Sequence, residues 1–121
     1  MKGFALFFPT FLSGCAVMTV GALLTTVQFF EGELRAEFSE RTMEEVVHAL
    51  KEVMEKDDWQ VTDQRGDEDR AILKASTALG ERVEVQLIQS ISARSIQVGI
   101  RVGAGDEVAS REILRRILEE L

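Results

Sequence analysis

The sequence contains very little of several residue types that build functional sites. Among its 121 residues there are one cysteine, one histidine, one proline and no tyrosine. A single cysteine excludes a disulfide within the chain, and a single histidine leaves too few ligands for a zinc site of the usual Cys/His kind. The chain therefore has to fold on the strength of one modest hydrophobic core.

Positive charge is also scarce. The formal net charge is −7, and Lys2 is followed by no charged residue before Glu31, so the negative charge belongs to residues 31–121. Binding to nucleic acid needs clustered cations that release counterions from phosphates, and adhesion to anionic lipid headgroups needs such clusters as well. The composition argues against both kinds of partner.

The uncharged amino-terminal segment divides the chain into an apolar head, residues 1–30, and a polar body, residues 31–121. A buried core helix is disfavoured because the head has no polar face. The uncharged run from Gly3 to Gln28 is long enough for a transmembrane helix. A basic start, an apolar stretch and then small residues are, in that order, the parts of a secretory signal.

The lone cysteine closes this apolar stretch in the motif Leu12-Ser13-Gly14-Cys15, which resembles the lipobox of bacterial lipoproteins. The resemblance implies a signal peptide over residues 1–14, cleavage between Gly14 and Cys15, and acylation of the Cys15 thiol. Residues 15–30 would then be a lipidated apolar tether or a membrane-proximal helix, and two or more acyl chains would make the anchor stable. An uncleaved membrane anchor, or a cysteine buried in another kind of structure, remains as an alternative.

The residue after the cysteine is Ala16 and not aspartate. In the enterobacterial lipoproteins that this motif resembles, an aspartate at that position signals retention in the inner membrane. The analogy favours the outer membrane, with the body of the protein facing the periplasm.

The polar body shows both strand and helix patterns. Strands are expected over residues 32–38, 58–63, 71–79, 82–88 and 95–102, with a turn over residues 64–70. Helical spacing over residues 42–57 follows a capping box of Thr42 and Glu45, and a second helix over residues 107–121 follows Asp106 as its cap. We expect an α+β fold, in which an antiparallel sheet of about five strands has both helices on one face, in the order strand, helix, four strands, helix.

This order and the lipobox resemble a family of small bacterial lipoproteins catalogued as domain of unknown function 3568. Its closing motif has an Arg-Val-Gly, a short gap and a Gly-Asp, followed by a serine and an aliphatic pair. In this sequence the matching residues are Arg101, Val102, Gly103, Gly105, Asp106, Ser110, Ile113 and Leu114. The resemblance implies an envelope location and an α+β domain, and it implies no activity.

The body offers few groups for catalysis. His48 is the single candidate general base at neutral pH, and its place on the first helix predicts an outward side chain. Ser90, Ser92 and Ser95 are expected in turns, without the base that a nucleophile needs. The acidic residues 66–70 lack the ligand spacing of a calcium loop. Phe38 and Trp59 are expected in the core, so we predict no catalytic residue, metal or cofactor.

Arg101 and Asp106 flank the glycine turn before the second helix. In one interpretation, Asp106 caps the helix and an ion pair between the two residues fixes the last strand to the helix. In the other interpretation, the two residues form a small polar recognition site. Alternation predicts that Arg101 points away from the helices, toward Glu84 or Gln86 of the neighbouring strand.

The function that we expect from the sequence is a non-enzymatic, lipid-anchored protein of the bacterial envelope that acts as a binding or structural module. Its partners would be membrane lipid, through acylated Cys15, and a protein of the envelope. The alternative is a small accessory subunit of a membrane complex, anchored by an uncleaved amino-terminal helix.

Overall fold

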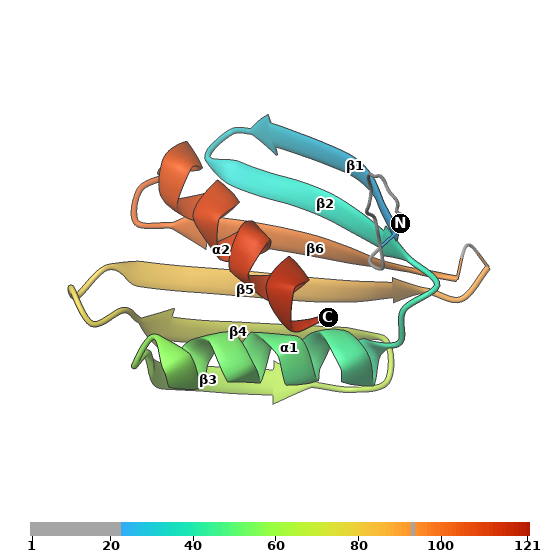
Figure 1. The fold of residues 1–121 in the computed structure, drawn as a ribbon, viewed down its shortest axis with the longest axis horizontal. Helices are drawn as coiled ribbons and strands as arrows, with labels where there is room; N and C mark the ends of the chain where they lie inside the picture. The colour runs from blue at the N-terminus through green and yellow to red at the C-terminus, as the bar shows by residue number, and fades with distance from the viewer. Residues whose placement is uncertain (1–22, 93) are drawn as a thin grey trace, which may run out of the picture.

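Six strands and two helices make up the part of the chain that the computed structural model describes, residues 23–92 and 94–121 (Figure 1). In chain order they are β1 (Leu23–Phe30), β2 (Glu33–Ser39), α1 (Met43–Lys56), β3 (Gln60–Gly66), β4 (Arg70–Ser76), β5 (Arg82–Ser90), β6 (Ser95–Val102) and α2 (Glu107–Glu120). From β2 onward this is the predicted order of strand, helix, four strands and helix.

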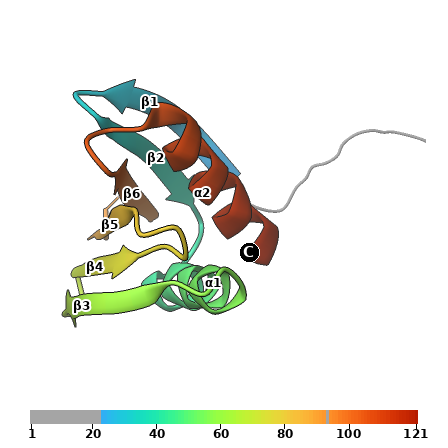
Figure 2. The same ribbon diagram turned by 90° about the vertical axis from the view of Figure 1, so that its left-hand side faces the viewer.

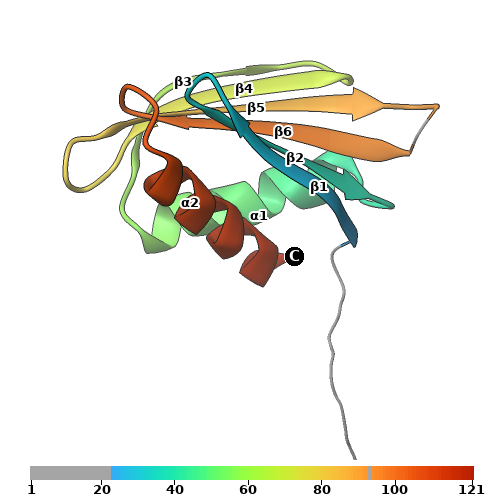
Figure 3. The ribbon, with the colours of Figure 1, turned by 90° about the horizontal axis from the view of Figure 1, so that it is seen from above.

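All six strands belong to one antiparallel sheet with the order β1-β2-β6-β5-β4-β3. Both helices lie on the same side of it, as the two turned views show (Figures 2 and 3). The predicted α+β class and the placement of the helices are confirmed. The sheet has one strand more than the expected five.

The additional strand is β1, at the edge of the sheet. Residues 15–30 were expected to form a tether or a helix, but Leu23–Phe30 pairs along its length with β2, with Val27 opposite Ala36 and Phe29 opposite Leu34. Threonine, valine and phenylalanine favour strands, and three side chains of β1 pack against the core: Leu24, Val27 and Phe29. Residues 1–22, which include Cys15 and the predicted cleavage site at Gly14, lie outside the described residues.

The core forms between the sheet and the two helices because apolar residues alternate along the central strands. One face of β2, β4, β5 and β6 is buried, as are one stripe of α1 and one of α2. The largest fully buried side chains are Leu34, Phe38, Val46, Val53, Val83, Val85, Leu87, Ile96, Val98, Ile100, Val102 and Ile117. Burial of these side chains provides the main stabilising free energy of the fold.

Each helix begins at the predicted cap. Thr42 Oγ1 accepts a hydrogen bond from the Glu45 backbone N–H at 3.1 Å, and Glu45 Oε1 accepts one from the Thr42 N–H at 2.9 Å. This second bond is the main reason why the pKa of Glu45 lies below its usual range. At α2, Asp106 Oδ1 accepts from the Ala109 N–H at 3.0 Å. The capping box and the Asp106 cap are both confirmed.

The turn between β3 and β4 is shorter than predicted. Gly66 still belongs to β3, and only residues 67–69 connect the strands. Asp67 Oδ1 accepts hydrogen bonds from the backbone N–H groups of Asp69 and Arg70, which lowers the pKa of Asp67. The acidic cluster is therefore a hairpin turn that is stabilised by hydrogen bonds from its own backbone to the Asp67 carboxylate.

Neither α1 nor α2, the helices of the described part of the chain, is long and apolar enough to cross a membrane.

Candidate functional site

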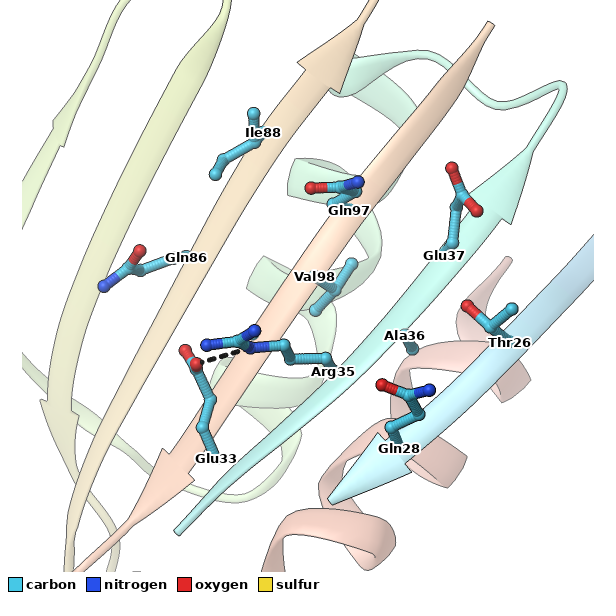
Figure 4. A pocket seen from close by; sticks show the side chains of 11 residues that line it. Thr26, Gln28, Glu33, Arg35, Ala36, Glu37, Gln86, Ile88, Gln97 and Val98 are labelled. Atoms are coloured by element: carbon cyan, nitrogen blue, oxygen red, sulfur yellow. Dashed lines mark hydrogen bonds and ion pairs between the residues drawn. The ribbon is translucent and has the colours of Figure 1, made fainter. Parts of the chain in front are cut away.

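The face of the sheet opposite the helices is polar, and no part of residues 23–92 and 94–121 covers it; we call it the uncovered face. It presents the residues that alternate with the core along the strands, and Figure 4 views part of it with the helices behind the strands. Its charged and amide side chains include Gln28, Glu33, Arg35, Glu37, Lys74, Arg82, Glu84, Gln86, Gln97 and Arg101. Two hollows on this face are lined by these residues.

The first hollow, of about 380 Å³, lies over β1, β2, β6 and β5 (Figure 4). Gly99 of β6 makes room in it, because a Cβ atom at that position would overlap the Glu33 carboxylate. Glu33 accepts a hydrogen bond from Arg35 Nε at 3.0 Å, and this ion pair lies across the neighbouring strand. The absence of a side chain in the middle of β6 therefore allows a surface ion pair to occupy the hollow.

Glu37, at the side of the same hollow, is held by two hydroxyl groups. Thr25 Oγ1 donates to Glu37 Oε1 at 3.2 Å, and Ser95 Oγ donates to Oε2 at 2.7 Å. Ser95 is only 3% exposed, so its hydroxyl is a fixed donor. The amides of Gln28 and Gln97 complete the lining, and each can both donate and accept hydrogen bonds. Such an arrangement suits recognition of a polar molecule by hydrogen bonds.

The second hollow, of about 330 Å³, contains Arg101. Its charged lining residues are Lys74, Arg82, Glu84 and Arg101. Arg101 lies directly opposite Glu84 in the register of β5 and β6, which is one of the two neighbours that the alternation of the strands allowed. Arg101 therefore belongs to the uncovered face.

The ion pair predicted between Arg101 and Asp106 is absent from the described residues. Asp106 uses its carboxylate to cap α2, whereas Nη1 of Arg101 lies beside Gly32, in the turn between β1 and β2. Gly103 and Gly105 separate the two residues and both have positive φ, 57° and 123°. The backbone reverses between them and sends their side chains in different directions.

The other residues singled out in the sequence lie in the helices, strands, turns and core of the domain, as follows. His48 is exposed on α1, and Phe38 is fully buried. Trp59 is half-buried against the core just before β3. Ser95 is the first residue of β6 and not a turn residue, and Ser90 is the last of β5; Ser92 lies in the turn between them. In residues 23–92 and 94–121 there is no group of three or more His, Cys, Asp or Glu residues that could hold a metal ion.

Sequence reasoning missed Lys74 and Arg82 as neighbours of Arg101. They lie on β4 and β5, and only the pairing of three strands brings them to one hollow. Both residues immediately precede a core residue in the sequence. Alternation along the strands therefore predicts that their side chains lie on the same face of the sheet as Arg101.

A comparison with curated proteins found no match. The model of the family described as "Protein of unknown function (DUF3568)" matches residues 3–120, which is nearly the whole chain, and the protein is therefore a member of that family.

Proposed function

We propose that the protein is a non-enzymatic binding module of the bacterial envelope, held at a membrane by lipid on Cys15 and facing the periplasm. The observation that carries the proposal is the motif Leu12-Ser13-Gly14-Cys15 placed just ahead of a folded domain. Only residues 16–22 separate Cys15 from the start of β1, and they span at most about 25 Å. A lipid on Cys15 would keep the domain close to the membrane surface.

The position of β1 supports one orientation of the anchored domain. Leu23 is opposite Ser39, which is opposite Ser95, so the chain enters the sheet at the end that carries the turn between β5 and β6. The turns between β1 and β2 and between β6 and α2 lie at the other end (Figure 1). A lipid anchor would hold the end of the sheet that carries Leu23 toward the membrane. The opposite end, which carries Arg101, would point away from the membrane.

The uncovered face of the sheet supports the binding role. It offers two polar hollows, while the carboxylates of Glu33 and Glu37 in the first hollow are engaged by neighbouring side chains. Groups fixed in this way present a preformed pattern of donors and acceptors to a partner. Because Ala16 follows the cysteine, we place the anchor in the outer membrane.

A second candidate function is an accessory subunit anchored by an uncleaved helix. Because β1 begins at Leu23, the uncharged run that is available for such a helix is residues 3–22. These 20 residues would just span a hydrocarbon core of about 30 Å. The length is sufficient, and processing at Cys15 distinguishes the two candidates.

Fatty-acid labelling of the protein expressed in a bacterial host tests the proposal. We expect the wild type to be labelled and to remain with membranes after a high-salt wash, and Cys15→Ala to be unlabelled and to accumulate as a longer precursor. Ser13→Ala is the matched control, because it keeps a small residue next to the cleavage site and should be processed normally. Normal labelling of Cys15→Ala would overturn the proposal, and an unlabelled, full-length wild type in the membrane would favour the accessory subunit.

A further inference from the structure

Three cationic residues line one hollow of the uncovered face because of the strand register. Lys74 and Arg101 lie opposite Glu84 on its two sides, and Arg82 precedes Glu84 by two residues on the same face of β5. Residues placed diagonally on adjacent antiparallel strands are within reach of long side chains. All three cations therefore line the second hollow.

These cations differ from most others in the domain. Within residues 23–92 and 94–121, neither Lys74, Arg82 nor Arg101 forms an ion pair. Lys51, Arg70 and Arg94 are also without an ion pair among the described residues, whereas the remaining cations are paired; the ion-paired cations are Arg35, Arg41, Lys56, Arg65, Arg111, Arg115 and Arg116. In a chain of net charge −7, a group of three unpaired cations is an unusual concentration of positive charge.

The one acidic group of the hollow is turned along its strand. Glu84 Oε2 accepts a hydrogen bond from Gln86 Nε2 at 3.3 Å, which draws the carboxylate away from Arg82. Lys74 and Arg82 are exposed, whereas Nη1 of Arg101 lies beside Gly32, in the turn between β1 and β2. The charged groups of Lys74 and Arg82 are therefore open to solvent.

We propose that Lys74, Arg82 and Arg101 bind a phosphate monoester group in its dianionic form. Three cations and one carboxylate give the hollow a charge of about +2, which matches a phosphate monoester carrying −1.5 to −2 near neutral pH. Arginine is suited to this ligand because its planar guanidinium makes paired hydrogen bonds to phosphate oxygens. The inference names a ligand class for the binding face proposed above, and it does not depend on the lipid anchor.

The hollow lies toward the end of the sheet away from Leu23, next to Gly103 and the turn before α2. If Cys15 carries lipid, this end points away from the anchoring membrane. The phosphate would then come from a soluble molecule and not from a headgroup of that membrane. The chemistry of the site is the same for both sources, so the test includes both.

Titration of the full-length protein in neutral detergent micelles tests the proposal, with backbone amide shifts as the readout. Glycerol phosphate is the soluble probe, and phosphatidic acid added to the micelles is the lipid probe. Salt is kept near 0.1 M, where a Debye length of about 10 Å screens the acidic residues outside the hollow. We expect saturable binding of glycerol phosphate, weaker at pH 5 than at pH 8 because the phosphate loses its second charge.

Substitutions assign the binding to the hollow. Arg82→Gln and Arg101→Gln should each weaken binding about tenfold, because each removes charged hydrogen bonds. Glu84→Gln should strengthen it severalfold, since it removes the one negative charge nearby. Arg65→Gln is the matched control, because Arg65 is ion-paired to Asp63 outside the hollow, and it should leave binding unchanged.

Binding of either probe that weakens in Arg82→Gln and strengthens in Glu84→Gln supports the site. No saturable binding of either probe, or binding that is the same in wild type, Arg82→Gln and Arg101→Gln, overturns it. An unchanged amide spectrum before titration verifies that each variant is folded. Cys15→Ala should bind glycerol phosphate as the wild type does, so failure of the lipid anchor and failure of the phosphate site are separately visible.

Discussion

Gly105 lies so close to Gly32 that a Cβ atom on Gly105 would stand 2.8 Å from the Gly32 Cα. Gly32 belongs to the turn between β1 and β2, and Gly105 to the turn between β6 and α2. Both residues have positive φ, +81° and +123°, a conformation that favours glycine. The contact joins the edge hairpin to the loop that starts α2, and it lies beside Nη1 of Arg101.

Gly105→Ala should lower the free energy of unfolding by about 3 kcal/mol, because the new methyl group meets backbone and the φ angle is strained. Gly103→Ala is the matched control in the same turn: its φ is also positive, but a Cβ there meets no atom within 4 Å. It should cost only about 1 kcal/mol. Urea denaturation of both variants measures the difference, and equal losses would contradict a close packing of the two turns.

Asp106→Ala should lower the free energy of unfolding by about 1 kcal/mol, because it removes the hydrogen bond to the Ala109 N–H. Asp106→Asn should retain most of the stability, since asparagine caps helices about as well as aspartate. Arg101→Ala should cost less than Asp106→Ala, because Arg101 has no ion pair with a described residue. Thermal melts compare the three, and a larger loss from Arg101→Ala would mean that Arg101 has a structural role.

The pKa of Glu45 predicts a pH dependence. It is lowered in the folded state by the hydrogen bond from the Thr42 N–H, so the ionised carboxylate stabilises α1. This contribution is complete above the pKa of an unfolded glutamate, about 4.3, and is lost as the pH falls through the lower folded value. Glu45→Gln keeps a capping-box residue but does not titrate. Urea denaturation at pH 7 and pH 3 should show a wild-type advantage over Glu45→Gln that is smaller at the lower pH.

Removal of β1 should destabilise the domain. Residues 31–121 alone lose Leu24, Val27 and Phe29, which pack against the core, and β2 becomes an exposed edge. We expect residues 23–121 to give a dispersed amide NMR spectrum and residues 31–121 to aggregate or to unfold at lower urea concentration. Equal stability of the two fragments would show that β1 contributes little to the fold.

The sequence predicted most of the fold because the central strands bury only one face. Regular alternation marked β2, β5 and β6, and the caps at Thr42 and Asp106 marked the starts of the helices. The strand β1 was missed because it contains no charged residue, and its sequence was therefore assigned to the apolar head. A bulge between Leu24 and Thr26 also interrupts its period of two.

The candidate site was predicted only in part. Local alternation predicted the outward direction of Arg101 and left its neighbour on the next strand open between Glu84 and Gln86; the structure places Arg101 opposite Glu84. Lys74 and Arg82 lie near Arg101 because of the pairing between strands, and the sequence alone does not give the register of that pairing. The ion pair with Asp106, one of the two interpretations of this turn, is absent from the described residues because two glycines with positive φ turn the backbone between Arg101 and Asp106.

The most direct test of the account is the intact mass of the wild-type protein purified from membranes of a bacterial host. A lipid-anchored protein should lack residues 1–14, begin at Cys15 and carry the added mass of two or three acyl chains. Digestion should place that added mass on the amino-terminal peptide that contains Cys15. A full-length mass from Met1 without acylation would contradict the lipid anchor.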